Sequence, residues 1–88
     1  MTALKHELWA ENEEEETFCL AGSRGAEARA RLSPNARLVW TVWAGSHSEA
    51  MTEYYAHRGW GVYSTEHAWD REPYPEKWAE EQRQEGAG

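Results

Sequence analysis

An apolar run over residues 37–44 constrains the fold of this chain more than any other stretch. Its sequence, Arg-Leu-Val-Trp-Thr-Val-Trp-Ala, would place large apolar side chains on both faces of a strand. Leu38, Trp40 and Val42 would share one face, and Val39 and Trp43 the other. Apolar residues on both faces favour a strand that is central to its sheet or covered on both sides. We therefore predict such a strand here.

A well-bounded helix is predicted over residues 46–58, directly after this strand. Ser46 and Glu49 match the capping box, in which a hydroxyl and a carboxylate each bind a free backbone N–H. Gly59 stands where a left-handed residue ends many helices, and Trp60 after it is predicted to pack back on the helix. One side of the helix would carry the less polar positions His47, Ala50, Met51, Tyr54, Tyr55 and Arg58.

Two shorter strands are predicted upstream, over residues 3–10 and 17–21. Leu4, His6, Leu8 and Ala10 would share one face of the first strand. The acidic segment between the two strands, residues 11–16, would be a solvated hairpin connection because its like charges repel one another. A short helix rich in Ala and Arg is predicted over residues 26–32, with only small side chains to dock it, and Pro34 would end it.

The C-terminal third is predicted to be irregular apart from two helical pieces. One turn is expected within residues 65–70, and a short helix over residues 76–83, while residues 84–88 should be a disordered tail. A chain of 88 residues makes a single domain, placed at residues 1–83. The predicted fold class is α+β: a three-stranded, mostly antiparallel sheet, one main amphipathic helix on one face, and a Trp-rich C-terminal segment around it.

Aromatic side chains must supply most of the interior. The chain has six Trp, four Tyr and one Phe but no Ile, and each large ring buries about 150–250 Å². Several rings lie in the polar C-terminal third, where they would either hold that segment onto the domain or stand exposed as a recognition surface. We predict exposure for Trp43 before any other ring, because a three-stranded sheet covered by one helix leaves its other face open. The binding candidates are Trp43, Trp60, Tyr63, Trp69 and Tyr74.

Charge and cysteine content limit the classes of partner. The formal net charge of −7 argues against binding to duplex nucleic acid or to anionic membranes, because both attract clustered Lys and Arg. A single cysteine, Cys19, cannot form an internal disulfide and is typical of a reducing compartment. The sequence also contains no signal-peptide pattern and no apolar stretch long enough to span a bilayer. We therefore expect a cytoplasmic protein.

No motif in the sequence defines an enzyme, a metal site or a cofactor site. The four histidines lack the short spacings of zinc ligands, and Cys19 has no base beside it in sequence. Glu53 and His57 lie four residues apart on the predicted helix and could form an exposed carboxylate–imidazole pair. A nucleophile elbow, a phosphate-binding loop and a calcium loop are all missing from the sequence. We expect no cofactor and no catalytic residues.

Four segments resemble a group of small bacterial proteins of unknown function. They are Leu-Val-Trp-Thr-Val at 38–42, Glu-Ala-Met-Thr-Glu-Tyr-Tyr at 49–55, Gly-Trp-Gly-Val-Tyr at 59–63 and Pro-Tyr-Pro-Glu-Lys-Trp at 73–78. The resemblance covers about the C-terminal half. It implies a bacterial, cytoplasmic, stand-alone domain, and it implies a surface position for Trp43, where members more often carry a charged residue. It carries no activity and no functional residues.

Three functional hypotheses follow. The first is a non-enzymatic protein-interaction module, self-associating through the open sheet face and Trp43 or binding another protein. The alternative is a small-ligand or carbohydrate-binding domain that uses rings of the C-terminal third, namely Trp60, Tyr63, Trp69 and Tyr74. The third is an enzyme with Glu53 and His57 as acid and base.

Overall fold

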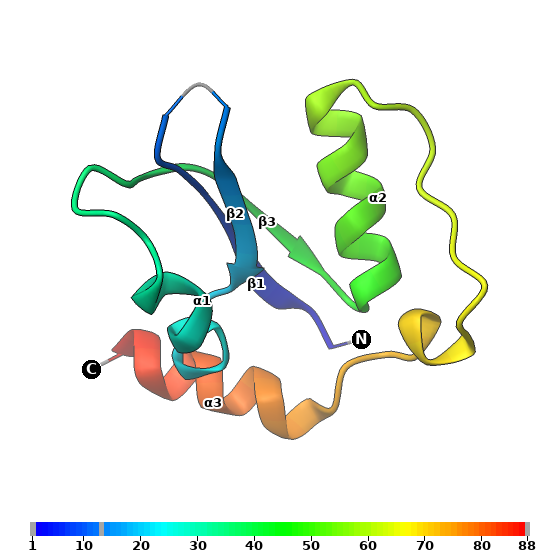
Figure 1. The fold of residues 1–88 in the computed structure, drawn as a ribbon. Helices are drawn as coiled ribbons and strands as arrows, with labels where there is room; N and C mark the ends of the chain where they lie inside the picture. The colour runs from blue at the N-terminus through cyan, green and yellow to red at the C-terminus, as the bar shows by residue number, and fades with distance from the viewer. Residues whose placement is uncertain (1, 13, 88) are drawn as a thin grey trace.

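The fold is α+β and is built on one three-stranded antiparallel sheet (Figure 1). The computed structural model describes residues 2–12 and 14–87, so Met1, Glu13 of the predicted hairpin connection and Gly88 of the predicted tail lie outside the described residues. The strand order is β2-β1-β3. The strands are β1 (Leu4–Ala10), β2 (Glu16–Leu20) and β3 (Arg37–Ala44). The helices are α1 (Ala26–Ala30), α2 (His47–Arg58) and α3 (Glu76–Ala87), and two 3-10 turns are η1 (Ser23–Gly25) and η2 (Ala68–Arg71).

The N-terminal strand β1, rather than β3, lies at the centre of the sheet. Leu4, His6 and Leu8 alternate along β1 and are buried on the face toward α2, as their spacing predicts. The prediction of a central or doubly covered strand over residues 37–44 is wrong, because β3 pairs only with β1 and forms an edge. Helix α2 covers Trp40 on one face of β3, where the indole stacks on His57. Leu38, Val39 and Trp43 remain about half exposed.

A register shift in the β1–β3 pair explains part of this misleading pattern. Leu8 pairs with Trp40, but its neighbour Trp9 pairs with Leu38, so Val39 is an extra residue in β3. Directly paired residues share a face, and Leu38 therefore joins Trp9 instead of continuing the face of Trp40. A strict two-residue alternation, which the sequence analysis assumed, ends at this bulge.

Helix α2 has the boundaries that the sequence predicts. The Ser46 hydroxyl accepts a hydrogen bond from the Glu49 N–H at 3.1 Å, and no return bond from the Glu49 carboxylate is formed among the described residues. Gly59 ends the helix with a left-handed φ of 72°, which a residue without a Cβ adopts at little cost. The ring of Trp60 then packs edge-on against Tyr55, with centroids 5.5 Å apart. Both ends of α2 are thus set by residues next to them in the sequence, the Ser46 hydroxyl at the start and Gly59 at the end.

Two neighbouring tyrosines divide the packing of α2. Tyr54 is buried against the sheet, where its ring stacks on Phe18 with centroids 4.5 Å apart, and its hydroxyl donates to Glu16 at 2.6 Å. Tyr55 faces the segment after the helix, where it meets Tyr63 edge-on at 5.2 Å. That segment runs along the outer side of α2 to η2 (Figure 1). The predicted wrapping of the C-terminal segment around the helix is confirmed.

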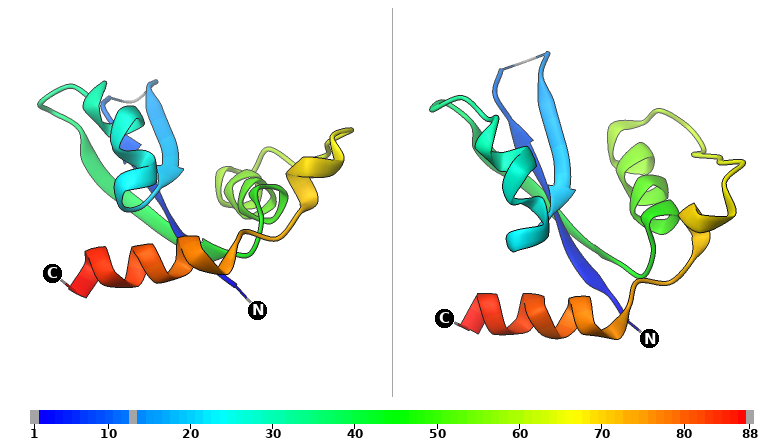
Figure 2. Two further views of the ribbon diagram at one scale, coloured as in Figure 1. Left: turned by 90° about the horizontal axis from the view of Figure 1, so that it is seen from below. Right: turned by 60° about the horizontal axis from the view of Figure 1, so that its bottom comes forward.

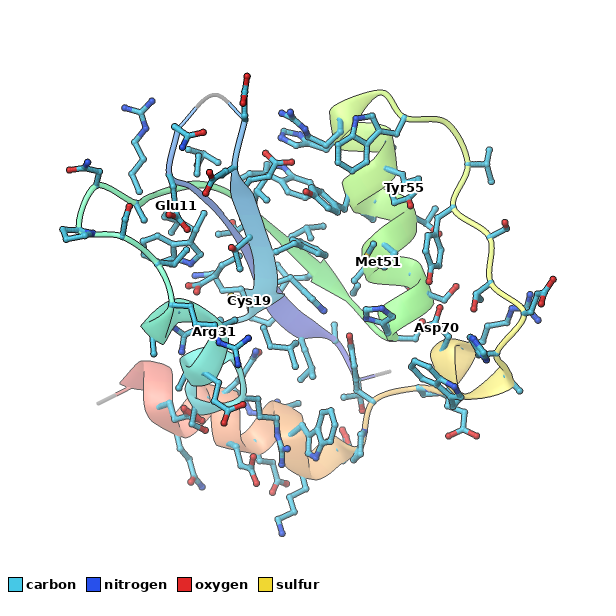
Figure 3. All side chains as sticks on the ribbon, in the orientation of Figure 1. Glu11, Cys19, Arg31, Met51, Tyr55 and Asp70 are labelled. Carbon is cyan, nitrogen blue, oxygen red and sulfur yellow. The ribbon has the colours of Figure 1, made fainter. Side chains whose placement is uncertain are left out.

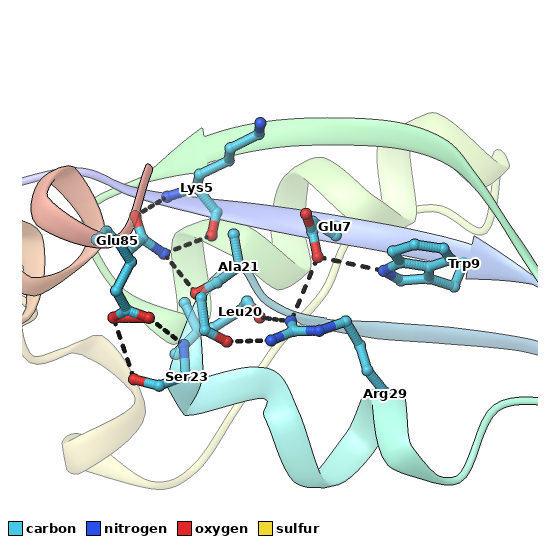
Figure 4. Close-up of polar contacts among 10 residues, drawn as sticks. Lys5, Glu7, Trp9, Leu20, Ala21, Ser23, Arg29 and Glu85 are labelled. Carbon is cyan, nitrogen blue, oxygen red and sulfur yellow. Dashed lines mark hydrogen bonds and ion pairs between the residues drawn. The ribbon is translucent and has the colours of Figure 1, made fainter. Parts of the chain in front are cut away.

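Helices α1 and α3 lie at the end of the sheet where β1 begins and β2 stops (Figure 2). Side-chain hydrogen bonds attach α1, because it buries no residue of its own. Arg29 donates to the Leu20 carbonyl at 2.8 Å, to the Gly22 carbonyl, and to Glu7 at 3.3 Å (Figure 4). One guanidinium thereby fixes the chain reversal after β2, which matches the weak apolar docking expected of this helix.

Gln82 of α3 replaces the missing strand partner of β1. Because β2 ends at Leu20, the backbone of Lys5 has no ladder partner on that side apart from the Ala21 N–H. The Gln82 amide fills this gap: it accepts from the Lys5 N–H at 2.8 Å and donates to the Lys5 carbonyl at 2.9 Å and the Ala21 carbonyl at 3.1 Å. A side chain thus completes the sheet where the second strand is too short.

Helix α3 continues to Ala87, beyond its predicted end at Arg83, so most of the predicted tail, residues 84–88, is helical. The Glu85 carboxylate accepts hydrogen bonds from the Ser23 N–H and, at 3.1 Å, from the Ser23 hydroxyl (Figure 4). A tertiary contact from η1 therefore holds the last turns, and no signal within residues 84–88 predicts it.

Substitution of Gln82 by Leu should lower the free energy of unfolding by about 1–3 kcal/mol, because partly buried backbone groups of Lys5 and Ala21 lose their partner. Chemical denaturation monitored by tryptophan fluorescence measures the change. Gln84→Leu, on the same helix but exposed, is the matched control and should stay within about 0.5 kcal/mol of the parent. Equal effects of the two substitutions would contradict the proposed role of the amide.

Candidate functional site

Within the described part of the chain, the outer edge of β3 presents unpaired backbone groups. In antiparallel sheets the N–H and C=O of successive residues point alternately to the two neighbouring strands. Lys5 directs its groups to the β2 side, as its bonds to Ala21 and Gln82 demonstrate. Its β3 partner Trp43, and Thr41 two residues before, therefore direct theirs away from β1. An edge of this kind is a template for pairing with another strand.

Exposed apolar side chains accompany this open edge. Leu38 is 44%, Val39 48% and Trp43 59% exposed, and β3 contains no acidic residue. We call these three side chains together with the outward backbone of Thr41 and Trp43 the β3 edge. Apolar surface next to unpaired backbone is typical of an interaction site. The predicted exposure of Trp43 agrees with its position.

The five predicted binding residues do not form one site. Trp43 lies on β3, apart from the others. Trp60 is exposed at one edge but packs on Tyr54 and Tyr55 and lies under the Arg58 guanidinium. Among the described residues, Trp69 and Tyr74 line one cavity, whose lining contains neither Trp43, Trp60 nor Tyr63.

Tyr63 holds the C-terminal segment in place. Its hydroxyl donates to Oδ2 of the buried Asp70 at 2.7 Å, and this hydrogen bond raises the pKa of Tyr63. Figure 3 shows Asp70 on η2 beside the first turn of α2, where its Oδ1 lies 3.4 Å from His47 Nε2. Tyr63 thus connects η2 with the segment along α2, which fits a structural role.

The cavity that Trp69 and Tyr74 share has a volume of about 580 Å³ and is mostly apolar. It lies between the α2-facing side of β1 and β2, the η1–α1 segment, η2 and the start of α3. We call it the aromatic cavity. Its rings come from His6, Phe18, His47, Trp69, Tyr74 and Trp78.

A pair formed by the buried His6 and the half-buried Tyr74 lies in the wall of this cavity. His6 Nδ1 is 3.0 Å from the Leu4 carbonyl, which can only accept, so this nitrogen carries the proton. Nε2 then accepts from the Tyr74 hydroxyl at 2.9 Å. Burial lowers the pKa of His6 and raises the pKa of Tyr74 to about 12, which keeps both groups neutral. Nothing in the sequence indicates that these distant residues would meet.

Of the residues weighed for catalysis, His57 and Glu53 lie on α2 and Cys19 lies on β2. His57 stacks on Trp40 with ring centroids 4.0 Å apart, and no ion pair with Glu53 is formed within the described residues. Cys19, on β2 (Figure 3), is half-buried, and burial raises the pKa of its thiol despite the nearby Arg29. A protonated thiol is a poor nucleophile. In residues 2–12 and 14–87 no group of His, Cys, Asp and Glu is arranged to hold a metal.

Among the residues that the structure describes, no helix has the length and apolar character needed to cross a membrane.

Comparisons with known proteins returned no match: no family model, no curated protein and no solved structure is similar to this chain. The site is therefore interpreted from its own geometry.

Lowering the pH from about 7.5 to about 5.5 should destabilise the protein through His6. The folded-state pKa lies below the ordinary value, so in this range the unfolded chain binds more protons, and the stability present at higher pH is lost as the pH falls. Urea denaturation at several pH values measures this loss, and His6→Phe should reduce it. His67→Phe, at an exposed position, should retain the parent's pH dependence; identical profiles for all three proteins would contradict the assignment.

Proposed function

We propose that this chain is a non-enzymatic protein-interaction module that associates with a second copy of itself through the β3 edge. One observation carries the proposal: the outward backbone groups of Thr41 and Trp43 stand on an edge strand whose side chains Leu38, Val39 and Trp43 are exposed. Antiparallel pairing of two β3 strands would satisfy these groups and would join the sheets of both copies.

The chemistry of the strand favours a second copy as the partner. Two identical strands that pair antiparallel are related by a two-fold axis, which is the commonest symmetry of soluble oligomers. The chain as a whole carries a net charge of −7, but β3 has no acidic residue and begins with Arg37. Repulsion between two copies is therefore weakest where their β3 edges meet. Trp43, the largest exposed ring of the edge, would supply a central buried anchor.

Thr41→Pro tests strand pairing directly. Proline removes only the N–H of Thr41, which points away from β1, so the β1–β3 ladder keeps its bonds. Trp43→Lys tests the apolar anchor, because a charged edge residue opposes pairing. We expect the parent to become a dimer as its concentration rises from about 1 μM to about 1 mM, and both variants to remain monomers over this range. Sedimentation equilibrium gives the molar masses.

The matched control is Val62→Lys, which places the same charge at a 90% exposed apolar position outside β3. This variant should dimerise like the parent. A parent that stays monomeric at the highest concentration, or a Thr41→Pro variant that dimerises unchanged, would refute pairing through the β3 edge. Thermal unfolding of each variant verifies that the fold is retained.

A further inference from the structure

The aromatic cavity has the size and lining of a small-molecule site. Its volume of about 580 Å³ lies within the roughly 300–1,000 Å³ of known ligand pockets, which combine apolar walls with a few placed polar groups. Trp69 is 63% exposed although it lies beside two histidines, His47 and His67, with ring centroids 6.3 and 5.6 Å away. Both histidine rings lie nearly parallel to the indole, at 27° and 24°, and more than half of the Trp69 surface at the rim of the cavity stays accessible to a ligand.

The His6–Tyr74 pair in the cavity wall can accept a hydrogen bond but has no proton to donate. The Tyr74 hydroxyl donates its hydrogen bond to His6 Nε2, and His6 Nδ1–H donates its own to the Leu4 carbonyl. The phenolic oxygen of Tyr74 accepts no hydrogen bond within the described part of the chain, so one of its lone pairs remains available. A ligand that reaches this oxygen must therefore carry an N–H or O–H group.

The charges around the cavity favour a cation. Arg24, the one Arg or Lys among the residues that line the cavity, is paired with Glu81 at 3.0 Å and lies 3.9 Å above the Trp78 ring. Glu72, also in the lining, has no ion-pair partner among the described residues. The net charge of −7 adds a long-range field of the same sign. Indole faces attract cations, and the Arg24–Trp78 contact is an example inside this cavity.

We propose that the aromatic cavity binds a small aromatic ammonium compound, whose ring stacks on Trp69, whose charge faces Glu72 and whose N–H donates to Tyr74. The site is independent of the β3 edge, because the cavity lining contains no residue of β3. Each of its three contacts selects a different property of the ligand: an aromatic ring, a positive charge and a hydrogen-bond donor.

Isothermal titration calorimetry with 2-phenylethylamine tests this proposal. We expect saturable one-to-one binding with a dissociation constant of about 1 mM or below. The anion 3-phenylpropionate, with a similar ring and the opposite charge, should bind at least about tenfold more weakly. The N,N,N-trimethylated amine keeps the charge but lacks N–H groups and should bind about three- to tenfold more weakly. These comparisons separate the contributions of charge and donor.

Substitutions in the cavity complete the test. Trp69→Ala, at a position that is 63% exposed, should weaken 2-phenylethylamine binding about tenfold, because the stacking partner of the ligand ring is lost. Tyr74→Phe should remove the preference for the amine over its trimethylated form. Trp60→Ala, a ring outside the cavity, is the matched control and should bind like the parent.

Three results would overturn the proposal: no saturable binding of 2-phenylethylamine up to about 10 mM, equal binding of 3-phenylpropionate, or unchanged binding by Trp69→Ala. Trp69→Ala and the ligand comparison decide the matter even when Tyr74→Phe does not fold. Binding should also be unchanged in Thr41→Pro, which separates the outcome of this experiment from that of the dimerisation experiment.

Discussion

A continuous series of ring contacts across one face of the sheet holds this structure together. Tyr54 of α2 stacks on Phe18 of β2, and Phe18 stacks on His6 of β1 at 5.5 Å. His6 then meets Tyr74 at 5.7 Å, and Tyr74 meets Trp78 of α3 at 5.8 Å. Offset and tilted ring pairs of this kind contribute beyond the area they bury. Helix, sheet and C-terminal helix are therefore connected by aromatic rings in a chain whose aliphatic supply is small.

Because most of the packed rings lie on this face of the sheet, apolar side chains of β3 remain exposed. A chain of 88 residues buries a smaller fraction of its surface than a larger domain does. Here the fully covered apolar side chains lie mainly in β1 and α2, whereas Leu38, Val39 and Trp43 of β3 are about half exposed. The β3 edge and the aromatic cavity thus have the same physical cause. The few large side chains of this short chain neither cover every strand nor fill all the space between the elements.

Polar side chains attach the small helices to the sheet, whereas apolar contacts would do so in a larger protein. Arg29 fixes the reversal after β2, Gln82 completes the ladder beside Lys5, and Glu85 holds the last turns of α3 against Ser23 (Figure 4). The Gln82 and Glu85 contacts join residues 77 and 62 positions apart in the sequence, whereas Arg29 reaches back nine positions to Leu20. Hydrogen bonds to backbone groups fix position and direction more strictly than apolar packing does, which gives short helices such as α1 a defined place.

The sequence by itself determined the features that depend on interactions within a few residues. The limits of β3, the Ser46 cap and the Gly59 end of α2 all follow from neighbouring residues, so they could be predicted. Only the tertiary structure decided that β3 is an edge, that Tyr74 meets His6 and that α3 continues to Ala87. These features depend on which distant segments come together, and hydrophobic periodicity records that a residue is apolar without recording which strand or ring will cover it.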